Sequence, residues 1–260
     1  CLKAGIRPIM ITGDHKITAS AIAKKLGILD ESKKAIEGRE IEQLTDDELD
    51  NLVEDVCVYA RVSPEHKVRI VDSWQRKGMI VAMTGDGVND APAIKSADIG
   101  VGMGITGTDV SKAASDMVLT DDNFATIVSA VEEGRKIFTN IKKAVKFLLS
   151  SNMGEVIALF IATMLSWQLF KPVHILWINL VTDTFPALAL GVEPAEGDVM
   201  NRAPRNSKAP FFNKKMWFEI LTHGAVEGGI ALGVYIYALN AFDSITATTM
   251  AFVTLGLTQL

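Results

Sequence analysis

The sequence contains very little cysteine: Cys1 and Cys57 are the only two among 260 residues. Two cysteines cannot form the disulfide framework of a small secreted domain, and their scarcity indicates a reducing compartment. Acidic residues outnumber basic ones, and the net charge of −5 argues against a general nucleic-acid-binding protein. The chain starts at Cys1 with neither a methionine nor a signal-peptide pattern, so we expect it to be a fragment of a longer protein.

Hydrophobic residues are abundant and unevenly distributed. They make up 48% of the chain, charged residues make up 22%, and the mean hydropathy is +0.24. This composition excludes a disordered protein. Residues 1–123 mix charged and apolar positions, whereas four apolar stretches follow residue 146. We therefore predict a globular domain over 1–123, a helical stalk over 124–146 and a membrane region over 147–260.

The four apolar stretches predict membrane-spanning helices. They cover 147–170, 172–192, 216–242 and 245–260, and a span needs about 20 residues, so the fourth is a shortened one. Two flanking segments are rich in basic residues: Arg135, Lys136, Lys142, Lys143 and Lys146 in the first, and Arg202, Arg205, Lys208, Lys214 and Lys215 in the second. Because such residues favour the cytoplasmic side, we predict a multi-pass protein with a cytoplasmic globular domain.

Polar residues inside the first two stretches indicate an ion path. Their oxygen-bearing side chains are Asn152, Glu155, Asn179, Thr182 and Asp183. A carboxylate in mid-membrane costs roughly 3 kcal/mol on insertion scales and usually marks an ion or proton pathway. Gly154 and Pro186 can loosen the helical hydrogen bonding and free carbonyl oxygens. An all-oxygen ligand set suits a hard cation such as Ca²⁺, and the alternative is structural polar packing.

The third stretch carries two further acids. Glu219 lies near its cytoplasmic end, and we interpret Glu227 as a helix-packing or interfacial residue.

Strand-like and helical segments alternate in the first 123 residues. Strands are expected at 7–11, 56–60, 79–83 and 98–101, and helices at 17–26, 64–77 and 91–96. Near-continuous apolar strands between helices favour an α/β fold with a doubly wound, mostly parallel sheet.

Two of these strands end in the same tripeptide, Thr-Gly-Asp, at residues 12–14 and 84–86. Ligands bind at the carboxyl ends of parallel strands, where glycine turns offer backbone amides to phosphate. Asp86 and Asp90 suit Mg²⁺, and Lys67 on the intervening helix can supply a point charge for a phosphoryl group. One Thr-Gly-Asp is an ordinary turn, but two at paired strand ends predict a phosphate site.

Residues 102–107 also fit the GxGxxG pattern of dinucleotide-binding proteins. The match lacks a clear βαβ context with an acidic ribose-binding residue, so we interpret the segment as glycine turns that lead to a capped helix.

Together these motifs resemble a P-type cation-transporting ATPase. The resemblance rests on MITGDHKITASAIAKKLGI, RVSPEHKVRIV, TGDGVNDAPAIKSADIGVGMG, SSNMGEV and INLVTD, in this order and over essentially the whole chain. It implies the second half of a haloacid-dehalogenase-like phosphorylation domain, followed by the fifth to seventh membrane helices and part of the eighth. Within the family, SSNMGEV and NLVTD are similar to Ca²⁺ pumps of the sarco/endoplasmic-reticulum and bacterial kind.

The resemblance also implies roles for single residues of the globular domain. Thr12, Gly13 and Asp14 would border the phosphate, and Lys67 would neutralise the phosphoryl group. Residues 84–90 would form a hinge in which Asp86 binds Mg²⁺, Asn89 contacts phosphate and Asp90 supports the metal site.

In the membrane region the resemblance implies a cation site. Asn152 and Glu155 match cation ligands of the fifth membrane helix, and Asn179, Thr182 and Asp183 match those of the sixth. Gln259 stands where the reticulum pumps carry a glutamate on the eighth helix, so one ion per cycle becomes an alternative to two.

Parts of such a pump are missing from the sequence. No DKTG occurs, so the phosphorylated aspartate, the nucleotide-binding domain, the actuator domain and four spans would lie in an N-terminal half of the same protein. We expect the fragment alone to be inactive. The full protein would use Mg²⁺ and ATP, through an aspartyl-phosphate, to move Ca²⁺ out of the cytoplasm across a lipid bilayer, the plasma membrane. The alternatives are a pump for Na⁺ or Mn²⁺, a membrane-anchored phosphatase of the same fold, and a truncated regulator of an intact pump.

Overall fold

The computed structural model describes residues 1–194, 197, 199–206 and 209–260. Lys208, one of the basic residues counted above, lies outside the described residues. The chain forms two compact units, Cys1–Val131 with Met200–Ala209 and Glu132–Val199 with Pro210–Leu260.

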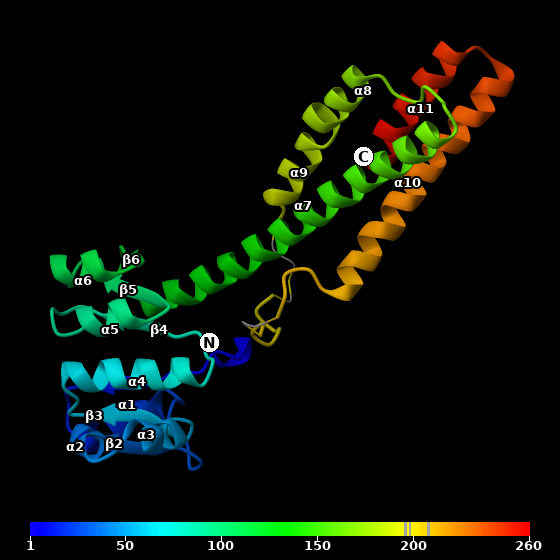
Figure 1. Cartoon of the computed structure of the whole chain (residues 1–260). Coiled ribbons are helices and arrows are strands. Elements are labelled where there is room, and N and C mark those ends of the chain that lie inside the picture. Colours follow the sequence, from blue (N-terminus) through cyan, green and yellow to red (C-terminus); the bar gives the residue numbers. More distant parts are fainter. Residues whose placement is uncertain (195–196, 198, 207–208) are drawn as a thin grey trace. The chain divides into compact units, whose positions relative to one another are not determined.

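Parallel strands alternate with helices in the first unit (Figure 1). After the short 3-10 helix η1 (Leu2–Ala4), the elements are β1 (Met10–Thr12), α1 (Lys16–Lys25), β2 (Lys34–Glu37), α2 (Gly38–Glu42), α3 (Asp46–Leu52), β3 (Val56–Ala60), α4 (Pro64–Arg76), β4 (Ala82–Gly85), α5 (Ala91–Ser96), β5 (Ile99–Met103), α6 (Asp109–Ala114) and β6 (Met117–Leu119). Every strand pairing is parallel, in the orders β1-β3-β2 and β4-β5-β6. The expected parallel α/β fold is confirmed, although its strands form two hydrogen-bonded sheets instead of one.

Strand β3 is the centre of the first sheet. All five of its residues are buried, and Tyr59 packs in a hydrophobic cluster with Ile41, Leu49 and Ile70 from the helices α2, α3 and α4. An apolar run of this kind is typical of a parallel strand that is covered on both faces. The chain that leaves β3 therefore reaches the carboxyl edge of the sheet at a fixed position, just before α4.

The second unit is helical. It contains most of α7 (Phe124–Met164), followed by α8 (Pro172–Trp177), the π-helix η2 (Ile178–Thr182), α9 (Thr184–Gly191), α10 (Lys214–Ala241) and α11 (Ser244–Gln259). The predicted stalk and first span are one continuous helix, which ends at Met164 rather than at residue 170. Ser166, with φ of 57°, lies in the turn that follows.

Two stretches of the described residues are long and apolar enough to cross a membrane, Phe124–Met164 and Pro172–Gly191. Many of their large apolar side chains are exposed, among them Phe160, Leu180 and Phe185. A protein surrounded by water rarely exposes so much apolar surface, whereas lipid accommodates it. The predicted spans over 216–242 and 245–260 correspond to α10 and α11, which do not meet the same criterion.

Small residues hold α7 against α10. A Cβ atom built on Gly228 would lie 2.6 Å from the carbonyl oxygen of Gly154, and one built on Gly224 would lie 2.8 Å from Cβ of Met153. The two backbones therefore touch along a Gly-x-x-x-Gly face of α10, as small residues permit between membrane helices. We expected Gly154 to loosen α7, but the helix is continuous there, and its glycine serves this close approach instead.

Candidate phosphate and cation sites

The first Thr-Gly-Asp lies at the carboxyl end of β1. The hydroxyl of Thr12 accepts a hydrogen bond from the amide of Asp14 at 3.1 Å, and the carbonyl of Asp14 accepts one from the amide of Arg61 at 3.1 Å. Gly13 and Asp14 are exposed. The turn is thus fixed to the end of β3 while its outer side stays open to a ligand.

The second Thr-Gly-Asp ends β4 and is organised by Asp90. This side chain is 8% exposed; its Oδ1 forms an ion pair with Lys67, and its Oδ2 accepts hydrogen bonds from the amides of Asp86 at 3.3 Å and Gly87 at 3.2 Å. A Cβ on Gly85 would lie 2.4 Å from Cβ of Asp90, so only glycine fits there. Both Asp90 oxygens are therefore engaged in positioning Lys67 and the turn.

Asp86 and Asn89 project from the same turn and are exposed. The carbonyl of Asp86 accepts hydrogen bonds from the amide of Thr108 at 2.8 Å and from the hydroxyl of Ser111 at 3.0 Å. The backbone of Asp86 is held in this way, while its carboxylate faces solvent. Mg²⁺ takes one or two carboxylates together with phosphate and water, so these residues fit a Mg²⁺ site that phosphate completes.

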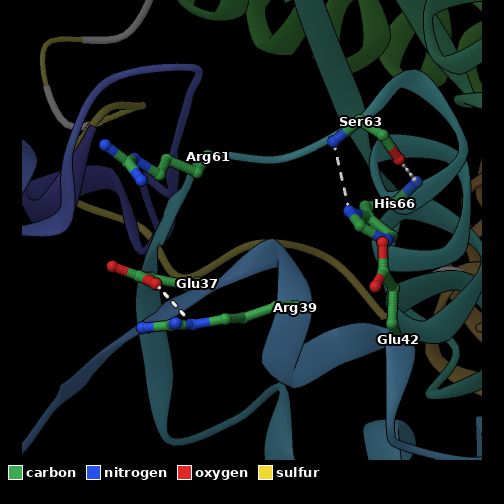
Figure 2. A pocket seen from close by; sticks show the side chains of 6 residues that line it. All are labelled: Glu37, Arg39, Glu42, Arg61, Ser63 and His66. Atoms are coloured by element: carbon green, nitrogen blue, oxygen red, sulfur yellow. Dashed lines mark hydrogen bonds and ion pairs between the residues drawn. The ribbon is translucent and has the colours of Figure 1, made fainter.

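A polar pocket lies beside the start of α4 and is lined by Glu37, Arg39, Glu42, Arg61, Ser63 and His66 (Figure 2). Ser63 and His66 cap the helix reciprocally: His66 Nδ1 accepts from the amide of Ser63 at 3.1 Å, and Ser63 Oγ accepts from the amide of His66 at 3.4 Å. Glu42 lies 3.5 Å from His66 Nε2. These contacts fix the first turn of α4 and so the position of Lys67, a role that the sequence analysis did not assign.

The GxGxxG segment is filled by a side chain of the protein itself. The carboxylate of Asp122 accepts hydrogen bonds from the amides of Gly104 at 2.6 Å, Ile105 at 3.0 Å and Thr106 at 2.7 Å. These hydrogen bonds lower the pKa of Asp122 to about 2, and the one from the Ile105 amide contributes most. Because a carboxylate occupies the loop amides, the interpretation of this segment as a structural turn is preferred to dinucleotide binding.

The acids predicted to bind the cation are buried in the second unit. Glu155 is 4% exposed and Asp183 is 2% exposed. The amide of Asn179 donates to Glu155 at 3.2 Å, and the hydroxyl of Ser151 donates to Asp183 at 2.7 Å. One carboxylate oxygen of each acid has no hydrogen-bond partner. The structure therefore brings together Glu155 and Asn179, and it adds Ser151, which lies in the SSNMGEV motif but was not predicted as a site residue.

The helix that carries Asn179 and Thr182 is widened into a π-helix. The amide of Asp183 donates to the carbonyl of Ile178, five residues earlier, at 3.0 Å. Pro186 lacks the amide that would donate to the carbonyl of Thr182. Such irregular turns are frequent at functional sites and leave carbonyl oxygens for a ligand. The loosening predicted beside Pro186 is confirmed.

The other two predicted cation ligands are placed differently. Asn152 donates to the carbonyl of Leu148 in its own helix at 2.7 Å. Gln259 is 6% exposed, and neither atom of its amide has a hydrogen-bond partner. Gly256, one turn earlier on α11, would bring a Cβ to 3.8 Å from Oγ1 of Thr182. Gln259 thus belongs to the face of α11 that meets η2, whereas Asn152 is turned along α7.

No group of three or more histidine, cysteine, aspartate or glutamate side chains is close enough to hold one metal ion within the described part of the chain. A cation at Glu155 and Asp183 would therefore need amide, hydroxyl and carbonyl oxygens as well. Hard cations accept such mixed ligand sets.

Comparison with known proteins relates each part of the chain to a protein family. Residues 1–98 match the haloacid dehalogenase-like hydrolases, and residues 167–260 match the C-terminus of cation transporting ATPases. The whole chain is 51% identical to calcium-transporting ATPase 1 of Bacillus cereus and 53% identical to the calcium-transporting ATPase of Bacillus subtilis. Over 91% of its length it is 48% identical to an endoplasmic reticulum calcium ATPase of Aspergillus fumigatus.

The chain belongs to the P-type cation-transporting ATPases. It spans 31% and 30% of the two Bacillus relatives and 25% of the Aspergillus one. The family assignment and the exposed apolar helices together indicate that the chain is part of a membrane protein. The predicted resemblance, with its haloacid-dehalogenase-like domain, is confirmed.

Proposed function

We propose that this chain is part of an ATP-driven pump that moves Ca²⁺ out of the cytoplasm. The observation that carries the proposal is the identity of about half of all residues to calcium-transporting ATPases along the entire chain. The buried, incompletely hydrogen-bonded acids Glu155 and Asp183 inside apolar helices support it, since an anchor has no use for them. Asn152, Asn179, Thr182 and Gln259 would complete the oxygen ligands.

In the globular unit, the proposal assigns phosphoryl transfer to the two Thr-Gly-Asp turns. Thr12, Gly13, Asp14 and Asn89 would surround the phosphate, and Lys67 would offset its charge. Asp86 would bind Mg²⁺, which when bound neutralises charge on the phosphoryl group, and Asp90 would hold Lys67 and the turn in place. Phosphoryl transfer needs positioning and charge stabilisation above all, and these residues supply both.

The aspartate that accepts the phosphoryl group would come from the rest of the protein. Strands β1 and β4 are edge strands of their sheets, and Ile11 packs in the same hydrophobic cluster as Met83. One more parallel strand between these edges would join the two sheets. Its carboxyl end would lie between Thr12 and Thr84, where an aspartyl-phosphate would meet Lys67 and Asp86. Without that strand the fragment would be inactive.

The proposed protein is multi-pass, with its globular unit in the cytoplasm and its helices in the plasma membrane. The basic residues before residue 147 and after residue 200 support this orientation. In the region that is described, Lys143 pairs with Glu193 and Lys146 with Glu219, so two of these positive charges also join the middle of α7 to the segment after α9 and to the first turns of α10.

The test is ATP-dependent uptake of radioactive Ca²⁺ into inside-out vesicles that contain the full-length protein. Uptake is expected to require Mg²⁺, and Asp183→Asn should weaken Ca²⁺ activation because it removes a buried carboxylate. Activation by Na⁺ or Mn²⁺ in the absence of Ca²⁺ would show that the pump transports a different cation. Phosphatase activity without any ion dependence would favour a membrane-anchored phosphatase, and an effect only on a co-expressed pump would favour a regulator.

A further inference from the structure

Glu227 lies at the contact between α7 and α10, beside the predicted cation ligands. Its Cβ is 3.2 Å, and its Oε2 3.3 Å, from the position that a Cβ on Gly154 would occupy. Gly154 immediately precedes Glu155. Because Gly224 and Gly228 on either side of Glu227 draw the two backbones together, this carboxylate is held against α7 at the level of Glu155.

The surroundings of Glu227 contain several polar atoms that the protein leaves without partners. Oε2 of Glu227 is buried and accepts no hydrogen bond, and the same holds for Oε1 of Glu155 and Oδ2 of Asp183. Hydrogen bonds join Glu155 to Asn179 and Asp183 to Ser151, and Glu227 lies against Gly154, so all three acids lie around residues 151–155 of α7. The buried amide of Gln259 is also without a partner. Buried polar groups are normally paired, so these oxygens are available as ligands for a cation.

We propose that Glu227 belongs to the intramembrane cation site and supplies there the carboxylate that Gln259 does not. This inference rests on the proposed transport of Ca²⁺. It replaces the interpretation of Glu227 as a helix-packing residue, because packing alone would favour an apolar side chain between two glycines of a helix contact. A carboxylate on α10 would give the site three negative charges although α11 contributes only a neutral amide.

Within the described residues, no three acidic, histidine or cysteine side chains are grouped closely enough to hold one metal ion. Glu227 would bind from the α10 side, next to the α7 backbone at Gly154, while Asp183 would bind from the end of η2. Two divalent ions, or one ion with a wider set of neutral oxygens, fit such an arrangement better than one ion held by three acids.

The experiment is equilibrium binding of radioactive Ca²⁺ to the purified full-length protein without ATP. The variants are Glu227→Gln, Gln259→Glu and the double variant that carries both changes. Glu219→Gln is the matched control, since Glu219 lies two turns earlier on α10 and pairs with Lys146. Glutamine preserves the shape of glutamate, so packing is maintained, and the melting temperature of each variant reports whether the fold is intact.

Glu227→Gln is expected to lower Ca²⁺ affinity about tenfold or more, as loss of groups beside metal sites commonly does. The double variant is expected to recover most of that loss, because the carboxylate is returned to the site from α11. Wild-type Ca²⁺ affinity in Glu227→Gln would overturn the inference about Glu227 without affecting the proposed pump function. A loss of affinity that the added Gln259→Glu change does not recover would do the same. A wild-type protein that binds no Ca²⁺ would overturn the proposed function, and the inference with it.

Discussion

Replacement of Gly85 by alanine is expected to disorganise the turn that positions Lys67. The added Cβ would lie 2.4 Å from Cβ, 2.7 Å from Cγ and 2.9 Å from Oδ2 of Asp90. Asp90 cannot move aside freely, because it is buried and its oxygens are bound to Lys67 and to two backbone amides. Overpacking at such a site costs about 1–3 kcal/mol. The substitution should therefore destabilise the globular unit and displace Lys67 together with Asp90.

The other Thr-Gly-Asp turn provides the control for stability. A Cβ on Gly13 would meet no atom within 4 Å, although the tripeptide is the same. Thermal unfolding of the full-length protein should show a melting temperature lower by roughly 2–12 °C for Gly85→Ala, since each kcal/mol shifts the midpoint by about 2–4 °C in a domain of this size. Gly13→Ala should melt like the wild type. Equal melting temperatures for the two variants would refute the steric argument.

The remaining predictions concern charge. Lys67→Ala in the full-length protein should slow formation of the phosphoenzyme by about a hundredfold or more while ATP affinity changes little, and rapid-quench measurements with labelled ATP would show a normal rate if Lys67 only pairs with Asp90. Asp86→Asn should suppress Mg²⁺-dependent phosphoenzyme formation, so normal levels at limiting Mg²⁺ would remove this residue from the metal site. The pKa of Asp50 is lowered from 3.8 to about 2, mainly by a hydrogen bond from the Arg76 guanidinium and next by one from the Ser73 hydroxyl. Because the folded pKa is the lower one, this stabilisation is present above about pH 4 and is lost as the pH falls toward 2. Asp50→Asn should then reduce the free energy of unfolding by about 1 kcal/mol at neutral pH, after allowance for solvent screening, and hardly at all near pH 2. Urea unfolding at both pH values measures the difference, and an equal effect at both would exclude the ion pair as its cause.

The strongest local patterns of the fold were predictable from the sequence. The apolar run 56–60 and the short helix 91–96 coincide with β3 and α5, because a buried strand and a proline-started helix have distinct signals. Strand β2 was missed because Lys34 and Glu37 at its ends are charged and only four residues pair. Its position is set by pairing with β3, a tertiary contact that periodicity does not reveal.

The phosphate site was predictable in composition but not in bonding. Two identical tripeptides at strand ends indicated the ligand class; Asp90 was singled out by its spacing from Asp86, and Lys67 by its place on the intervening helix. The sequence gives no sign that Asp90 uses both oxygens inside the protein, or that Asp122, 15 or more residues after the GxGxxG segment, fills its amides. Both contacts connect residues that are brought together only when the turns have formed.

The intramembrane site shows the same limit more sharply. Oxygen-bearing residues in apolar stretches predicted its chemistry, and Pro186 predicted irregular helical bonding near Thr182. Helical spacing relates residues on one helix, however, and says nothing about which face of another helix meets it. Glu227 was interpreted without regard to its glycine neighbours, yet those glycines bring α10 against α7 closely enough to set its carboxylate beside Glu155. The pattern Gly-x-x-Glu-Gly was therefore the available signal, because small residues that draw two membrane helices together also determine which acid faces the other helix.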